Sequence, residues 1–119
     1  CSCSKAIAAF AEPEFQDCIV SKNLRQYTEH TKTSQKDLYA EFQKIAERGF
    51  ADCDQEIDMG IASVAAPVSI GNIGAIFSIG AVGPIRRFGE AYRNEIGVKL
   101  VELSTRVSGA IQLCNVAEL

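Results

Sequence analysis

Two runs of alternating small and apolar residues, Ile61–Ile70 and Ile73–Val82, predict two β-strands in the middle of the chain. The dipeptide Gly71-Asn72 separates them and tolerates the positive φ that a two-residue hairpin turn requires. We therefore expect an antiparallel hairpin whose register is set by this turn. In that register Ser63 lies opposite Gly80, and the neighbouring pairs follow from it.

The two faces of this hairpin differ in character, because successive side chains of a strand point to opposite faces. One face is bulky at its ends and small in its middle: Ile61, Ser63, Ala65, Ile76, Ser78, Gly80 and Val82. The other face is predicted to be ordinary core: Val64, Val68, Phe77 and Ile79. The small side chains form either a floor for a packed helix or room for a ligand, and the pattern alone leaves both open.

Helical periodicity and capping residues predict four helices around the hairpin. They are Cys3–Phe10, a helix that begins at Glu12-Pro13-Glu14 and ends near Lys22-Asn23, a helix capped by Ser34 that stops at Arg48-Gly49, and a long helix over Glu90–Val116. A short strand is expected over Phe50–Cys53. The fold class is therefore α/β in composition (α+β), with an antiparallel sheet and helices packed on it. Three strands leave a sheet edge that a neighbouring segment or chain should cover.

The spacing of apolar residues also predicts which helix faces are buried. In the second and third helices, the inward residues are expected to be Phe15, Cys18, Ile19, Leu38, Phe42 and Ile45. In the last helix, the expected stripe is Ile96, Leu100, Leu103, Val107 and Ile111, with Val98 and Val101 outside it and available to another subunit. The carboxylates of Glu41 and Glu56 are expected to be solvated, as charged side chains usually are.

Composition restricts the class of function. A chain of 119 residues forms one domain, here taken as residues 1–119. Its net charge of −3 argues against a grip on nucleic acid by this segment alone. No apolar run reaches the roughly 18 residues of a membrane span, so no membrane partner is expected. The chain begins with Cys rather than Met, and we expect it to be a fragment of a longer protein.

The cysteines and the single histidine give little support to catalysis. The five cysteines are Cys1, Cys3, Cys18, Cys53 and Cys114, and they form no CxxC pair typical of zinc sites. Reduced thiols are the simplest interpretation, and a reactive Cys3 or Cys53 is the alternative. His30 lies in a polar stretch without a Ser-His-Asp arrangement around it. We therefore expect no enzyme activity, no metal and no cofactor.

A set of short motifs, in order and at consistent spacing, resembles the C-terminal effector-binding domain of the IclR family of bacterial transcription regulators. The motifs are Lys5-Ala6-Ile7, Tyr27-Thr28 with Thr31, Arg48-Gly49-Phe50-Ala51, Asp54-Gln55-Glu56, Met59-Gly60-Ile61, Ala65-Ala66-Pro67-Val68 and Gly83-Pro84. The resemblance covers about Cys1 to Leu113. It implies a GAF-like domain that binds a small metabolite, with an organic acid expected.

The same resemblance implies how such a domain works in a whole regulator. Ligand binding would change how an attached winged helix-turn-helix holds DNA, and both that part and the first strands of the effector domain would precede Cys1. A cytoplasmic protein that self-associates to a dimer or tetramer is expected. The pocket residues carried over from the family are Ser2, Cys3, Cys53, Ser63, Gly80 and Val82.

The chain departs from the family's pattern at the pocket itself. The family's two strand serines are Gly80 and Val82 here, its usual cysteine is Ser63, and an often acidic or serine position is Cys53. Fewer polar anchors predict a ligand that is larger or less polar than a two- or three-carbon acid. Two other classes of function stay open: a GAF-like cysteine redox enzyme, and a dimerisation module without a ligand.

Overall fold

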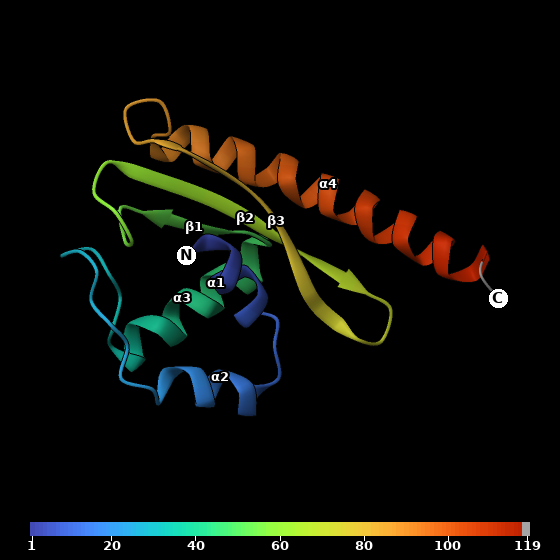
Figure 1. Ribbon diagram of the computed structural model, residues 1–119, viewed down its shortest axis with the longest axis horizontal. Coiled ribbons are helices and arrows are strands. Elements are labelled where there is room, and N and C mark those ends of the chain that lie inside the picture. The colour runs from blue at the N-terminus through green and yellow to red at the C-terminus, as the bar shows by residue number, and fades with distance from the viewer. Residues whose placement is uncertain (118–119) are drawn as a thin grey trace.

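Three strands form one antiparallel sheet in the order β1-β2-β3, with helices on both faces (Figure 1). The computed structural model describes residues 1–117, so the last two residues of the expected domain lie outside the described part. The strands are β1 (Ala51–Asp54), β2 (Ile61–Ile70) and β3 (Gly74–Pro84). The fold class predicted from the sequence is confirmed.

The helices form two layers around the sheet. Helix α4 (Glu90–Ala117) runs along one face, and α1 (Ser2–Ala8) and α3 (Gln35–Arg48) lie on the other (Figure 1). Helix α2 (Pro13–Val20) packs on α3 at the outside of that layer. No helix within residues 1–117 is long and apolar enough to cross a membrane.

The predicted register of the hairpin is wrong by two residues. Ser63 lies opposite Val82, and Gly80 lies opposite Ala65. The turn is one residue longer than predicted. Among residues 1–117, Gln55 is the only non-glycine residue with a positive φ. Asn72 therefore does not supply the positive φ that a two-residue turn of this kind requires. A bulge opposite Val68/Ser69 adds the second residue. Beyond the bulge, from Phe77 to Pro84, the total shift is even, so each of these residues still points to its predicted face.

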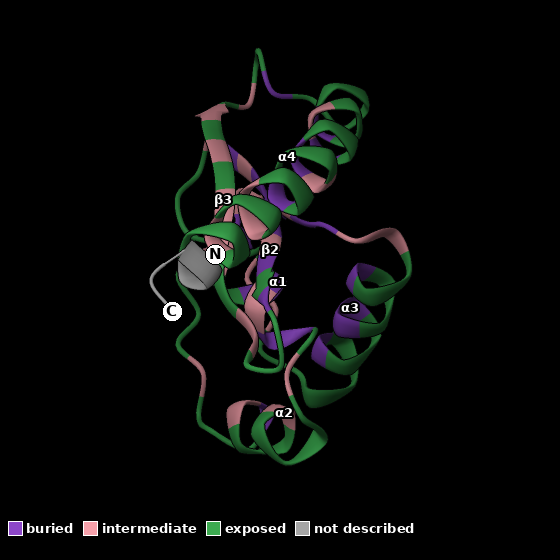
Figure 2. Cartoon of the chain, turned by 90° about the vertical axis from the view of Figure 1, so that its right-hand side faces the viewer, coloured by how far each residue is buried: buried purple, intermediate pink, exposed green. Residues whose placement is uncertain are grey.

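Each face of the sheet has its own apolar cluster. Figure 2 shows buried residues, in purple, on the sheet and on α3 and α4 to either side of it. On the α4 side, the buried residues are Phe50, Ala62, Val64, Ala66, Phe88 and Leu100. On the opposite side, they are Ala6, Ala8, Ala9, Val20, Leu38, Phe42, Ile45, Ala51 and Ala65. Alanines dominate the second cluster, so the short helix α1 can lie close to β2 and β3.

Two glycines fix where helices end or approach. Ser34 caps α3 by accepting a hydrogen bond from the Asp37 amide, as predicted. Gly49 ends the same helix with a φ of 89°, a conformation that glycine adopts without strain. In α4, a Cβ at Gly97 would come within 2.4 Å of the Phe50 ring. Because Gly97 has no side chain, α4 can pack directly against the Phe50 ring.

Several burial predictions are wrong. Phe15, Cys18, Phe77 and Leu103 are exposed. Helix α2 buries little beyond Val20, and the far end of the hairpin extends past the helices α1 and α3 (Figure 1). Helix α4 buries Leu100 and Ser104 instead of Leu103. Val101, expected outside the core, packs in the α4 cluster and touches Gly49. The buried positions Leu38, Phe42 and Ile45 of α3 are confirmed.

Candidate functional site

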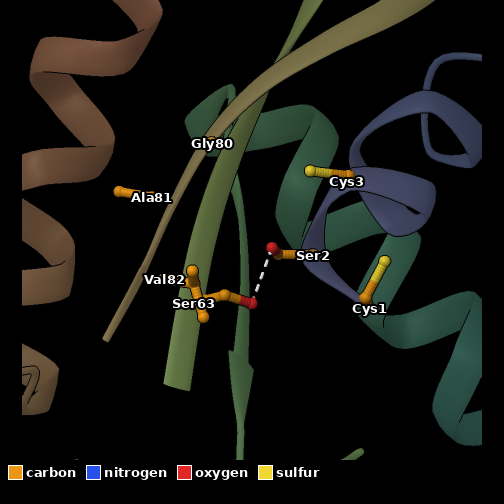
Figure 3. A pocket seen from close by; sticks show the side chains of 7 residues that line it. All are labelled: Cys1, Ser2, Cys3, Ser63, Gly80, Ala81 and Val82. Carbon is orange, nitrogen blue, oxygen red and sulfur yellow. Dashed lines mark hydrogen bonds between the residues drawn. The ribbon is translucent and has the colours of Figure 1, made fainter. Parts of the chain in front are cut away.

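An open hollow lies between the first turn of α1 and the hairpin (Figure 3). Its volume is about 240 Å³, and its lining residues are Cys1, Ser2, Cys3, Ser63, Gly80, Ala81 and Val82. Five of the six residues that the resemblance assigns to a ligand pocket are in this set. The two halves of the wall come from segments about sixty residues apart, which the packing of α1 on β2 and β3 brings together.

The sixth residue, Cys53, lines an adjoining hollow of about 230 Å³. Its other lining residues are Cys1, Ile57, Asp58, Ile61, Ser63 and Val82. The two hollows share Cys1, Ser63 and Val82, so they form one composite site on either side of these three residues. We call this composite site the α1–hairpin pocket.

Gly80 determines how closely α1 approaches the floor of the pocket. A Cβ at this position would lie 3.2 Å from the Sγ of Cys3 and 2.9 Å from the carbonyl oxygen of Val64. A side chain here would therefore push against both the helix and the neighbouring strand. The sequence left open whether the small residues pack against a helix or leave room for a ligand. In the structure, α1 packs on them and a hollow remains beside it.

The polar side chains of the first hollow include a pair of hydroxyls. The Oγ atoms of Ser2 and Ser63 lie 2.7 Å apart and form a hydrogen bond (Figure 3). Each hydroxyl can both donate and accept, so the pair can turn its hydrogens toward a carboxylate or a carbonyl oxygen. Val82, which is 71% exposed, presents an apolar surface beside this pair. The arrangement suits a ligand with one polar group and an apolar body.

The surroundings of Cys53 make its thiol less reactive. All five cysteines of the chain are free. Burial, and then the negative charge of Glu56, raise the pKa of the Cys53 thiol above its ordinary value. Because the thiolate is the nucleophile, a raised pKa makes this cysteine less reactive at neutral pH.

A buried cluster of charges lies behind α1, and it was not predicted from the sequence. Lys5 is 8% exposed, and its Nζ lies 3.1 Å from Glu41 Oε1 and 3.0 Å from Glu56 Oε2. Lys32 Nζ adds a contact of 2.5 Å with Glu56 Oε1. The expectation that Glu41 and Glu56 are solvated is therefore wrong, because their cationic partner comes from a distant helix.

Charge pairing also determines the ionisation of Glu56. Burial by itself would raise the pKa of this carboxyl, but the charges of Lys5 and Lys32 outweigh it and hold the pKa below its ordinary value.

One feature of the sequence indicates this cluster. Lys5 stands alone in an otherwise small and apolar helix, where a cation needs a buried partner.

Part of the pocket wall was also not predicted from the sequence. Cys1 lines both hollows, and Ile57, Asp58 and Ile61 line the second one. Among the described residues that line the pocket, Asp58 is the only charged side chain. A ligand held here meets hydroxyls, thiols and aliphatic surface, and in the second hollow also the Asp58 carboxylate.

The fold and the pocket define a class: an antiparallel sheet domain with a hollow between a short helix and a hairpin. Residues 1–109 match the family described as "Bacterial transcriptional regulator IclR C-terminal", and the chain belongs to this family. This family is one of transcription regulators rather than enzymes, which sets aside the redox-enzyme alternative. None of the curated proteins matches the sequence.

Solved structures of regulators share this fold. The repressor BlcR of Agobacterium tumefaciens superimposes with a TM-score of 0.87 at 15% identity, over 94% of this chain and 46% of that one. The IclR of Thermotoga maritima gives a TM-score of 0.83 at 27% identity, over 91% and 44%. The chain thus spans slightly less than half the length of these regulators.

A third structure is an inducer-binding domain in complex with a ligand. It belongs to the transcription factor PobR of Acinetobacter, as a double mutant bound to 3-hydroxybenzoic acid. Its TM-score is 0.78 at 15% identity, over 94% of this chain and 63% of that one. The family match together with this neighbour supports an effector-binding domain of a regulator as the role of the chain.

Proposed function

We propose that this domain binds a small organic acid in the α1–hairpin pocket and thereby changes how an attached DNA-binding part holds DNA. The observation that carries the proposal is the hollow between α1 and the hairpin, with the hydroxyls of Ser2 and Ser63 paired at its wall. Five of the six residues carried over by resemblance meet around this hollow, and Cys53 lines the adjoining one, which supports their role as ligand contacts.

The proposed ligand is an acid with an apolar body, larger than two or three carbons. Its carboxylate would accept hydrogen bonds from Ser2 and Ser63, and its body would lie against Val82 and the bare backbone of Gly80. The aromatic acid bound to the inducer-binding domain of PobR supports this class.

The wider setting of the domain is part of the same proposal. A winged helix-turn-helix and the first strands of the domain would precede Cys1, and one of those strands would pair with the long free edge of β3. That edge carries no charged residue over Gly74–Pro84, and such edges are normally covered in native proteins. Dimers or tetramers in the cytoplasm, with effector biasing one arrangement, complete the proposal.

A thermal-shift comparison tests the ligand class. The melting temperature of the chain is measured with 3-hydroxybenzoate and with pyruvate, each up to millimolar concentration. A ligand at a hundred times its dissociation constant stabilises a fold by about 2.7 kcal/mol, so a rise of several degrees is expected with the aromatic acid. A rise confined to pyruvate would overturn the proposed ligand class, and no rise with either acid would contradict an acid ligand.

Two serine variants show where the acid binds. Ser63→Ala should abolish most of the rise, because it removes one hydroxyl of the pair. Ser78→Ala is the matched control, since Ser78 lies on the same face of the hairpin but outside the pocket. Equal shifts in the two variants would place the acid elsewhere.

A further inference from the structure

We propose that Lys5 is the positioning residue that ties the first turns of α1 to α3 and to the β1–β2 turn, so that occupancy of the α1–hairpin pocket is transmitted to the segment 21–34. The inference rests on the proposed function only in taking this pocket as the ligand site. The contacts on which it depends form a continuous series. This series begins at Ser63, passes through α1 to the charge cluster, and ends at the segment 21–34.

The inner end of this series of contacts is α1 itself. Ser2 and Cys3 line the pocket, and Lys5 lies on the same helix less than one turn further on. Hydrogen bonds from the Lys5 amide to Cys1 O (3.1 Å) and from the Ala9 amide to Lys5 O (2.9 Å) make one unit of this stretch. A ligand that takes over the Ser2 or Ser63 hydroxyl breaks their mutual hydrogen bond, and α1 then shifts as a whole.

The middle of this series of contacts is the ammonium group of Lys5. It contacts Glu41 of α3 and Glu56 of the β1–β2 turn at 3.0–3.2 Å, and all three side chains are about nine-tenths buried. Loss of one partner of a buried ion pair strongly destabilises the fold, because the other charge stays buried without compensation. A displacement of α1 therefore either draws α3 and the turn along with it or opens the cluster.

The outer end is the irregular segment between α2 and α3. Lys32 contacts the same carboxylate of Glu56 at 2.5 Å. The hydroxyls of Thr28 and Thr31 donate to the carbonyl oxygens of Gln55 and Glu56, the first at 2.6 Å. These contacts hold the segment to the β1–β2 turn, so a change at Glu56 reaches both Lys32 and the Thr28–Thr31 loop.

A double-mutant cycle tests this coupling without any metabolite. Cys3→Met extends a side chain into the hollow and stands in for occupancy, and Lys5→Met removes the ammonium while keeping the length of the stem. Amide hydrogen exchange by mass spectrometry is followed over residues 21–34 in the parent chain, both single variants and the double variant. Because no ligand is added, the outcome is independent of whether an organic acid binds.

The proposal predicts that Cys3→Met changes exchange over 21–34 by about 2- to 30-fold in the parent background and leaves it unchanged in the Lys5→Met background. A purely structural Lys5 would alter the baseline and leave the effect of Cys3→Met intact. That result would overturn the inference, as would an unchanged rate over 21–34 in Cys3→Met itself.

A milder variant keeps the test decisive if Lys5→Met does not fold. Lys32→Met removes only the half-exposed outer cation and leaves the contacts between Lys5, Glu41 and Glu56 in place. In this background, Cys3→Met should still change exchange around residues 54–58, while its effect over 21–34 is reduced. An undiminished effect over 21–34 would contradict the part of the route that runs through Lys32, and an unchanged rate around residues 54–58 would contradict the link from α1 to Glu56.

Discussion

Gly80 lies against Cys3: a Cβ on the glycine would be 3.2 Å from the Cys3 Sγ, closer than an ordinary van der Waals contact. The same atom would be 2.9 Å from the carbonyl oxygen of Val64. The seat of α1 on the hairpin, and with it the shape of the pocket, therefore depends on the missing side chain at position 80.

Gly80→Ala should destabilise the fold by about 1–3 kcal/mol, the usual effect of overpacking a fitted contact. Urea unfolding measures the change. Adding Cys3→Ala should recover part of it, because the Sγ is removed while the contact with Val64 O remains. A single variant as stable as the parent chain would show that α1 does not press on β3.

Gly97→Ala should also be destabilising, although alanine favours helices by up to about 1 kcal/mol over glycine. The new methyl would meet the Phe50 ring at 2.4–2.7 Å, and relieving that clash costs about 1–3 kcal/mol. Gly109→Ala in the same helix is the matched control, since its Cβ would meet nothing within 4 Å. The account requires opposite signs for the two variants in urea unfolding.

Lys5→Met should lower the free energy of unfolding by about 3–5 kcal/mol, because it leaves Glu41 and Glu56 buried without their shared cation. Lys32→Met should cost clearly less, since the Lys32 side chain is 36% exposed and water can replace it. Denaturant unfolding of the two variants gives the comparison. Equal losses would mean that burial does not distinguish the two lysines.

The stability of the chain should depend on pH through Glu56. Its folded pKa lies below the ordinary value of 4.5, so its ionised form stabilises the fold fully above about pH 4.5, and this stability is lost as the pH falls through the folded pKa. The groups around it are Lys5, Lys32 and Glu41. Thermal unfolding between pH 3 and 7 should therefore show a flatter acid limb for Glu56→Gln.

Some acid sensitivity should remain in Glu56→Gln, because the pKa of Asp52 is lowered as well. There, burial opposes ionisation, and Arg48 outweighs it with a contact of 2.6 Å. Adding Asp52→Asn should flatten the curve further. An acid limb unchanged by both substitutions would contradict the assignment of these two carboxylates.

Local patterns were sufficient to predict much of this fold. Ser34 and Gly49 bound a helix at the predicted ends because capping depends on neighbouring residues alone. The face of Ser63, Gly80 and Val82 was predicted correctly despite the wrong register, since a shift of two residues preserves the alternation of side chains.

What the sequence could not predict depends on distant partners. Glu41 and Glu56 are buried because Lys5 reaches both from another helix, and periodicity within α3 contains no information about that contact. The extra residue in the bulge next to Val68 is likewise a property of the paired strands rather than of either strand alone.

The central claim is that the hollow beside Ser63 holds a small acid. A titration of the ¹⁵N-labelled chain with 3-hydroxybenzoate, followed by amide chemical shifts, tests it most directly. The account predicts saturable shifts that are largest at Ser2, Cys3, Ser63, Gly80 and Val82. No saturable shifts, or shifts centred on the separate hollow around Phe10 and Ile73, would contradict it.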